Sequence, residues 1–156
     1  MTKLSPWKQY LVGFLAVIIA LLISVTVVFH LSMKPRSQAR ATAFSVAKKH
    51  ASLQTMSRFD LYHGSSTYYT VFGKTKDGQE KIVLIGEADK KVYVYDASEG
   101  ISRTKAQAIA KKNGAKNPDK VLFGYSEDNP IWEVRATNGY YLINFKTGEL
   151  MKREGL

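Results

Sequence analysis

Three hydrophobic patterns follow one another along the chain, and the first is an uninterrupted apolar run. Residues 10–33, YLVGFLAVIIALLISVTVVFHLSM, contain no side chain charged at neutral pH if histidine is taken as neutral. About twenty apolar residues span the hydrocarbon core of a bilayer. A cleaved signal peptide would have a shorter apolar region, roughly 7–15 residues, ending in small residues. Here Lys34-Pro35 follows the run. The sequence therefore predicts an uncleaved anchor over 10–33, after a short tail over 1–9.

The second pattern is helical spacing, which occurs twice. Pro35 should close or kink the membrane helix or open the next one, and a second helix is predicted to about Leu53. A further helix is predicted with Ser102 as its cap and Gly114 as its stop. The i, i+3, i+4, i+7 positions of the two helices agree; they are Ala43, Val46, Ala47 and His50, and Ala106, Ile109, Ala110 and Asn113.

The third pattern is strand-like alternation, which follows each of these helices. The connections between strands have hairpin length and include Lys76-Asp77-Gly78 and the hairpin dipeptide Asn138-Gly139. The predicted strands are Arg58–His63, Thr67–Lys74, Glu80–Glu87 and Val92–Asp96, then Lys120–Ser126, Ile131–Thr137, Tyr140–Phe145 and Leu150–Lys152.

A repeat joins these patterns. AFSVAKKHASL begins at residue 43 and AQAIAKKNGAK at residue 106, and YYTV at 68 and IWEV at 131 have the same offset of sixty-three. Each half is predicted to be one helix on an antiparallel meander, which makes the class α+β. The predicted domains are 36–98 and 99–156. Units of about sixty residues are marginal alone, so we expect the two to pack together.

The repeat also predicts which strand residues face each helix. Tyr69 and Val71 should face the first helix, and Trp132 and Val134 the second. Tyrosine is abundant on the predicted strands, and alternation should leave some rings exposed or between the two units. The strand tyrosines are Tyr68, Tyr69, Tyr93, Tyr95, Tyr125, Tyr140 and Tyr141.

Charge leaves the membrane orientation open. The part of the chain after the apolar run has a formal net charge of +8, and such a surface favours anionic neighbours: lipid headgroups, wall polymers or nucleic acid. Two cations precede the apolar run, and Lys34, Arg36 and Arg40 follow it. The positive-inside rule applied to this count places the carboxyl-terminal part in the cytoplasm. A short amino tail before a long apolar segment also suits a signal anchor with its tail inside.

Candidate catalytic groups are few and scattered. The chain has no cysteine, and its three histidines, His30, His50 and His63, form no zinc-ligand pattern. Ser65 and Ser66 lie near His63, with Asp60 as the available acid, but this spacing defines no triad. No Gly-rich loop with a phosphate-binding lysine follows a strand. We predict no catalytic, cofactor-binding or metal-binding residues and no enzyme activity.

Several motifs together resemble the TseB-like (YpmB) family of regulators of cell-wall elongation in Gram-positive bacteria. They are Tyr68-Tyr69-x-Val71-x-Gly73, Glu99-Gly100-Ile101-Ser102, Trp132-Glu133-Val134 and Phe145-x-Thr147-Gly148. The resemblance covers nearly the whole chain. It implies two cystatin-like, PepSY-related domains outside the membrane, with the amino end inside. It also implies binding to a class B penicillin-binding protein, the elongation transpeptidase.

The resemblance carries over no catalytic or partner-contact residues, and three other functions stay open. One is a PepSY-type inhibitor or chaperone of an extracytoplasmic peptidase. Another is a wall hydrolase relying on carboxylates such as Asp128 and Glu133. The third is a cytoplasm-facing module for anionic lipid or nucleic acid, although the family interpretation leads us to expect no nucleic acid. The contact surface for a partner is not predicted.

Overall fold

The computed structural model describes residues 6–155, apart from the side chains of residues 30–35. The first five residues of the predicted tail and Leu156 lie outside the described residues, as do the side chains of His30, Lys34 and Pro35. The chain divides into two compact units, residues 1–39 and residues 40–156, and helix α1 (Pro6–Ala51) contributes to both.

The first unit contains the apolar part of α1. Within Pro6–Phe29, an 18-residue stretch has a mean hydropathy of 3.0, and its side chains are exposed in the structure. At 1.5 Å per residue the 24 residues of Pro6–Phe29 are about 36 Å long, enough to cross the roughly 30 Å hydrocarbon core. The polar side chains of Ser24 and Thr26 donate hydrogen bonds to the backbone carbonyls of Ala20 and Leu22. The helix therefore has the length and composition of a membrane span.

Two separate helices were predicted on either side of Pro35, but α1 is one helix. Proline lacks one N–H donor, yet its fixed φ is compatible with a helix, so a helix can continue past it with one hydrogen bond fewer. The helix ends at Ala51, close to the predicted Leu53, and Ser52 follows with a φ of 53°.

The second unit begins with a four-stranded antiparallel sheet in the order β1-β2-β3-β4. Its strands are β1 (Leu53–His63), β2 (Thr67–Thr75), β3 (Glu80–Gly86) and β4 (Val92–Asp96). β1 starts five residues before the predicted Arg58. The pairing with β2 shifts between Leu53 and Thr55 and again between Met56 and Arg58. Such irregularities interrupt the alternation of side chains, so the early part of β1 carries no clear strand pattern.

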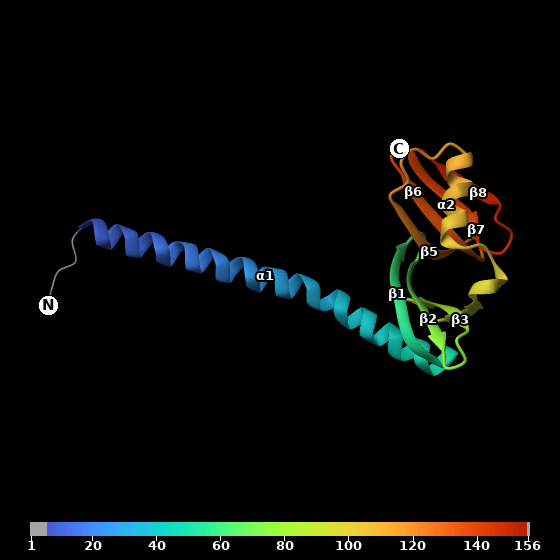
Figure 1. The fold of residues 1–156 in the computed structure, drawn as a ribbon, viewed down its shortest axis with the longest axis horizontal. Helices are drawn as coiled ribbons and strands as arrows, with labels where there is room; N and C mark the ends of the chain where they lie inside the picture. The colour runs from blue at the N-terminus through green and yellow to red at the C-terminus, as the bar shows by residue number, and fades with distance from the viewer. Residues whose placement is uncertain (1–5, 156) are drawn as a thin grey trace. The chain divides into compact units, whose positions relative to one another are not determined.

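A short helix, η1 (Ala97–Glu99), leads to α2 (Arg103–Lys112) and a second antiparallel sheet in the order β5-β6-β7-β8. The predicted ends of α2 are confirmed: Ser102 accepts a hydrogen bond from the Lys105 N–H at 3.2 Å, and Gly114 has a φ of 95°. The strands are β5 (Lys120–Ser126), β6 (Asn129–Ala136), β7 (Gly139–Asn144) and β8 (Leu150–Glu154). Figure 1 shows α2 along one face of this sheet.

Two turns of the second sheet differ from their predicted positions. Glu127 and Asp128, both with positive φ, form the connection between β5 and β6, so β6 starts at Asn129 instead of Ile131. The next connection is Thr137-Asn138, because Ala136 pairs with Gly139, the predicted second turn residue. The Asn138 side chain accepts a hydrogen bond from the Lys116 N–H and donates one to the Gly114 carbonyl. These bonds hold this turn against the end of α2.

The helix faces of the two halves agree with the repeat. Ala43 and Ala47 of α1 and Ala106 and Ala110 of α2 are all buried, at the same offset of sixty-three. Their small side chains let each helix lie close to its sheet. The predicted α+β class, with a helix on a meander in each half, is confirmed.

The strand positions facing the helices agree only in part. Val71 and Val134 are fully buried, and Trp132 is 3% exposed. Tyr69 packs at the edge of the first core, but it is only partly buried and its hydroxyl donates to Glu87 at the surface. The indole and the phenol ring therefore occupy corresponding strand positions but differ in burial.

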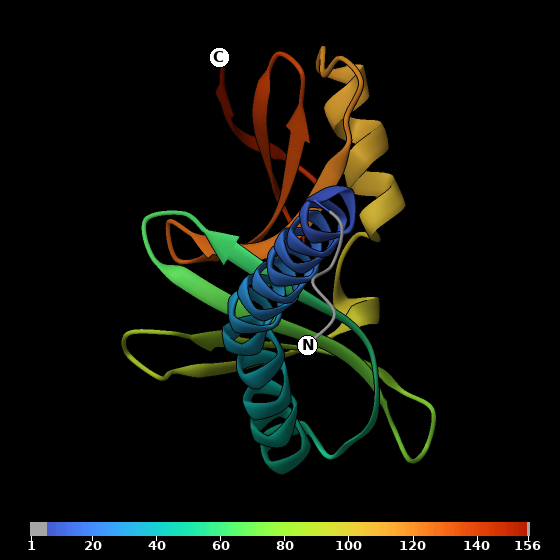
Figure 2. The ribbon, with the colours of Figure 1, turned by 90° about the vertical axis from the view of Figure 1, so that its left-hand side faces the viewer.

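The expected packing of the two halves is confirmed by one shared core. Ile82 and Leu84 of β3 belong to the same buried cluster as Phe123 of β5, Trp132 of β6 and Phe145. Viewed from the side, in Figure 2, the β1–β2 and β5–β6 hairpins lie near each other, and residues of both line one pocket. The first sheet therefore packs on α1 with one face and on the second half with the other.

Replacing Trp132 with alanine tests this core. Loss of the indole should lower the free energy of unfolding of a soluble fragment, residues 36–156, by about 3–5 kcal/mol. Tyr69→Ala, at the corresponding but partly exposed position, should cost less. Urea denaturation followed by circular dichroism measures both. A Trp132→Ala fragment as stable as the parent would contradict the shared core.

Candidate functional site

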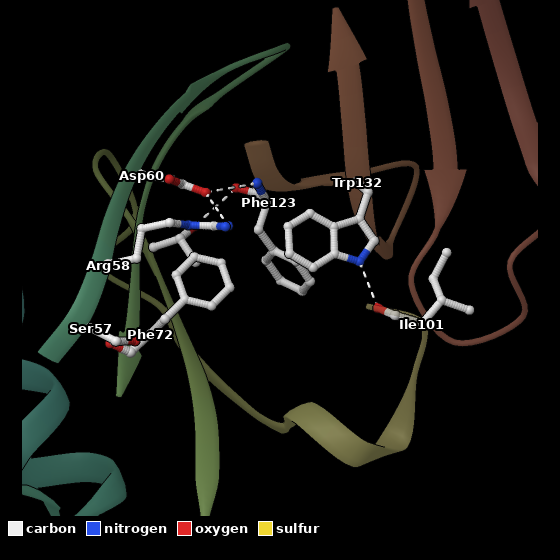
Figure 3. A network of polar contacts seen from close by, with 8 residues as sticks. Ser57, Arg58, Asp60, Phe72, Ile101, Phe123 and Trp132 are labelled. Carbon is white, nitrogen blue, oxygen red and sulfur yellow. Dashed lines mark hydrogen bonds and ion pairs between the residues drawn. The ribbon is translucent and has the colours of Figure 1, made fainter. Parts of the chain in front are cut away.

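A buried polar network fixes the junction between the two sheets (Figure 3). Asp60 on β1 is 7% exposed, and its Oδ2 accepts the Phe123 backbone N–H at 3.3 Å. Thr70 on β2 is fully buried, and its Oγ1 donates to the Phe123 carbonyl at 3.0 Å. Both backbone groups of one β5 residue are thus bound by side chains of the first sheet.

Arg58 completes the network. Its guanidinium Nη2 lies 2.7 Å from Asp60 Oδ2, and its charge lies over the ring of Phe72, 3.9 Å from the centroid. The Phe72 ring is in turn stacked on Trp132 with centroids 5.9 Å apart. The Trp132 Nε1–H donates to the Ile101 carbonyl at 2.9 Å, just before α2. A chain of contacts therefore runs from β1 to the beginning of α2.

Burial disfavours the charged forms of both Arg58 and Asp60. Desolvation raises the pKa of Asp60, although the Arg58 charge and the Phe123 N–H act in the opposite direction. Desolvation likewise lowers the pKa of Arg58. The Arg58 Nε is buried and has no hydrogen-bond partner among the described residues. The attraction between the two groups therefore offsets a substantial desolvation cost, so removal of one partner should be strongly destabilising.

Tyrosine rings continue the junction toward the surface. Tyr62 is 2% exposed and packs against Gly124, where an added Cβ would lie 2.4 Å from the ring. Tyr68 lies near Tyr125, with centroids 5.7 Å apart, and Tyr93 is stacked on Tyr125 at 4.8 Å. Burial raises the pKa of Tyr62 to about 12, so its phenol stays protonated at neutral pH. Some strand tyrosines thus lie between the two halves of the second unit, as expected.

A groove opens beside this junction, on the face of the second sheet opposite α2. The β1–β2 and β5–β6 turns form one wall, and outward-facing side chains of β6, β7 and β8 form the rest. Its lining is Tyr62, His63, Gly64, Ser65, Ser126, Glu127, Glu133, Arg135, Tyr140, Leu142, Lys152 and Glu154. We call it the hairpin groove.

Two ion pairs lie in the hairpin groove. Glu133 is 6% exposed, and its Oε1 lies 2.7 Å from Arg135 Nε. Lys152 Nζ and Glu154 Oε1 are 2.6 Å apart and more exposed. Leu142, which is only partly buried, supplies apolar surface near these charges. This mixture of paired charges, hydroxyls and apolar surface suits contact with a polypeptide, whose backbone and side chains offer complementary groups.

The structure brings together some of the residues that the sequence offered as candidate catalytic groups. His63, Ser65 and Glu133 all line the hairpin groove. The His63 ring is hydrogen-bonded to Thr67 through Nδ1, and Glu133 is paired with Arg135. His50, at the end of α1, lies elsewhere, and Asp128, in the β5–β6 turn, is not among the residues that line the groove; both are exposed. Within residues 6–155, no three histidine or acidic side chains are grouped to hold a metal ion.

Sequence reasoning missed Arg58, Thr70 and Tyr62. Asp60 was weighed only as the acid of a triad. The offset of sixty-three did contain a signal, because it relates Asp60 to Phe123, the residue whose N–H the carboxylate accepts. An acid two positions from an arginine on one predicted strand was a second signal, since the two side chains share a face.

The fold and the site define an α+β protein with an apolar amino-terminal helix, tandem helix-on-meander units and a polar groove beside their junction. Residues 42–86 match the family described as the cell wall elongation regulator TseB-like domain. The Bacillus subtilis protein named "Probable cell wall elongation regulator TseB" is 29% identical over 144 residues, covering 87% of this chain and 89% of that protein.

A solved structure is also similar. The YpmB protein from Bacillus subtilis aligns with a TM-score of 0.68 and 28% identity, over 74% of this chain and 96% of the other. Together these similarities confirm the resemblance to the TseB/YpmB family that was found in the sequence.

Asp60→Ala should destabilise the fragment 36–156 by about 3–5 kcal/mol, because it leaves Arg58 buried without its partner. Asp60→Asn should cost less, since the amide oxygen still accepts the Phe123 N–H. Asp77→Ala, in an exposed turn, serves as the control. The midpoints of urea unfolding, compared at a constant dependence of the unfolding free energy on urea concentration, measure the differences in stability. Equal stability of the Asp60→Ala and Asp77→Ala fragments would exclude a structural role for the network.

Proposed function

We propose that the chain regulates cell-wall elongation from the outer side of the membrane, by binding a class B penicillin-binding protein. The family match over residues 42–86 and the name of the relative support the first part of this proposal. The apolar helix Pro6–Phe29 supports membrane attachment. In this topology the amino end is inside, and residues 36–98 and 99–156 are two extracytoplasmic domains.

The hairpin groove is the feature that supports binding as the mode of action. Its walls come from hairpins of both halves, and the Asp60–Phe123 and Thr70–Phe123 hydrogen bonds hold those halves together. A surface fixed in this way loses little conformational freedom on binding. An anchor shared with a membrane-bound transpeptidase would raise the effective concentration of the two partners.

Action by contact requires no chemistry from this chain. The histidine and the buried carboxylate of the groove are engaged with Thr67 and Arg135. These bonds favour a binding role over the hydrolase alternative. His63→Ala should therefore leave function intact, provided that the protein still folds.

Charge reversal in the groove tests the proposal. Lys152→Glu replaces one partner of an exposed ion pair with a like charge beside Glu154, and it should reduce co-purification with the transpeptidase at least about tenfold. Lys91→Glu is the matched control, because Lys91 is an exposed lysine paired with Asp89 in the turn between β3 and β4. Quantitative pull-down from detergent-solubilised membranes provides the measurement.

Three results would contradict this proposal. Equal recovery of the transpeptidase with both variants would show that the contact surface lies outside the hairpin groove. Capture of a peptidase, with no transpeptidase even by the unaltered chain, would favour the inhibitor alternative. Loss of complementation by His63→Ala while transpeptidase binding persists would revive an enzymatic role.

A further inference from the structure

Nearly all the net charge of residues 40–156 comes from one segment. This part of the chain has nineteen Lys and Arg against thirteen Asp and Glu. Five of the cations and none of the acids lie within residues 103–116, so the remainder has fourteen cations against thirteen acids. The five are Arg103, Lys105, Lys111, Lys112 and Lys116. A strongly basic segment therefore lies on an otherwise balanced body.

Three cations of α2 point away from the core. Ala106 and Ala110 are fully buried against the second sheet. At 3.6 residues per turn the opposite side of the helix carries Lys105, Lys111 and Lys112. All three are exposed, and the small residues Thr104 and Ala108 between them are exposed as well. We call this side the outer face of α2; a ligand can approach its backbone closely between the lysines.

These charges contribute little to the fold, although the charge of Arg103 acts weakly on the buried Arg58–Asp60 pair. Within the described part of the chain, none of the five cations takes part in an ion pair. Cations on or beside the strands do form pairs; they are Arg58, Lys74, Lys81, Lys91, Arg135 and Lys152.

The helix dipole explains only part of the pattern. Cations stabilise the carboxyl end of a helix, where Lys111 and Lys112 lie. Arg103 and Lys105 lie near the amino end, where the dipole favours acids, and the first turn contains none. Helix stability therefore gives no reason for the cations at this end.

We propose that the outer face of α2 binds a linear polyanion with repeating phosphodiester groups, of the kind that a cell-wall polymer provides. Lys105 and Lys112 are seven residues apart, about 10 Å along the helix. Lysine acts as a compact charge on a flexible stem, which suits a chain of phosphates without fixed geometry. This surface is distinct from the hairpin groove and does not depend on the transpeptidase.

The composition of the segment favours this ligand over other anions. Residues 103–116 contain no aromatic ring on which nucleic-acid bases could stack. Ile109, the one large apolar residue among them, packs against the core, so the outer face lacks the apolar side of a helix that inserts into a lipid surface. It also lacks the aromatic anchors typical of protein interfaces.

The test uses the full chain in nanodiscs of zwitterionic lipid, with poly(glycerol phosphate) as the probe. The triple variant Lys105→Gln, Lys111→Gln, Lys112→Gln should bind about tenfold more weakly at ~50 mM salt. The slope of log K against log salt concentration should be shallower by about two, because each lost charge contributes roughly 0.7 for a single-stranded polyanion. The control triple Lys49→Gln, Lys76→Gln, Lys146→Gln removes the same charge from exposed positions elsewhere and should bind like the parent.

Glutamine keeps a high helix propensity, and melting curves confirm that each variant is folded. Single Lys105→Gln and Lys112→Gln variants should each show part of the loss.

Equal weakening of binding in both triple variants would show that the effect is one of overall charge and would overturn the proposal. Absence of binding by the parent would also overturn it. Binding that needs the three lysines but occurs only on anionic phosphatidylglycerol nanodiscs would assign the face to lipid instead. Transpeptidase recovery should be unchanged in the triple variant, which separates this surface from the groove.

Discussion

The second unit depends on the backbone of one residue, Phe123. Its N–H and C=O are bound by Asp60 and Thr70, two side chains of the other sheet. A hydrogen bond to a buried charged group is stronger than a neutral one, and leaving such a group unpaired is costly. This interaction fixes where β5 lies on β1 and β2. The shared core beneath Trp132 and the hairpin groove beside Tyr62 both follow from that placement.

Much of the fold could be predicted because it rests on local patterns. The helix faces and strands β4 and β5 were predicted from spacing alone, and the repeat related Ala43 and Ala106 correctly. The beginning of β1 was missed because its pairing with β2 is irregular. The continuation of α1 past Pro35 was missed because proline disfavours a helix interior without forbidding it.

The site could be predicted only residue by residue. His63, Ser65 and Glu133 were each recognised as polar residues of interest, but no spacing indicated that they would line one groove. Their proximity depends on how far the β1–β2 hairpin extends past β5, which is a property of the packing between sheets. The burial difference between Tyr69 and Trp132 has the same origin. Trp132 lies under both α2 and Phe72, whereas Tyr69 lies at the edge of the first core.

The roles proposed for the groove and for α2 share one requirement: residues 36–156 must be outside the cell. The charges flanking the apolar run favour the opposite orientation by the positive-inside rule, so the question must be decided directly. Protease added to intact, wall-stripped cells should remove an epitope fused to the carboxyl end, while a cytoplasmic marker stays whole. Full protection of that epitope until the cells are lysed would contradict a role in the cell wall and favour a cytoplasm-facing module.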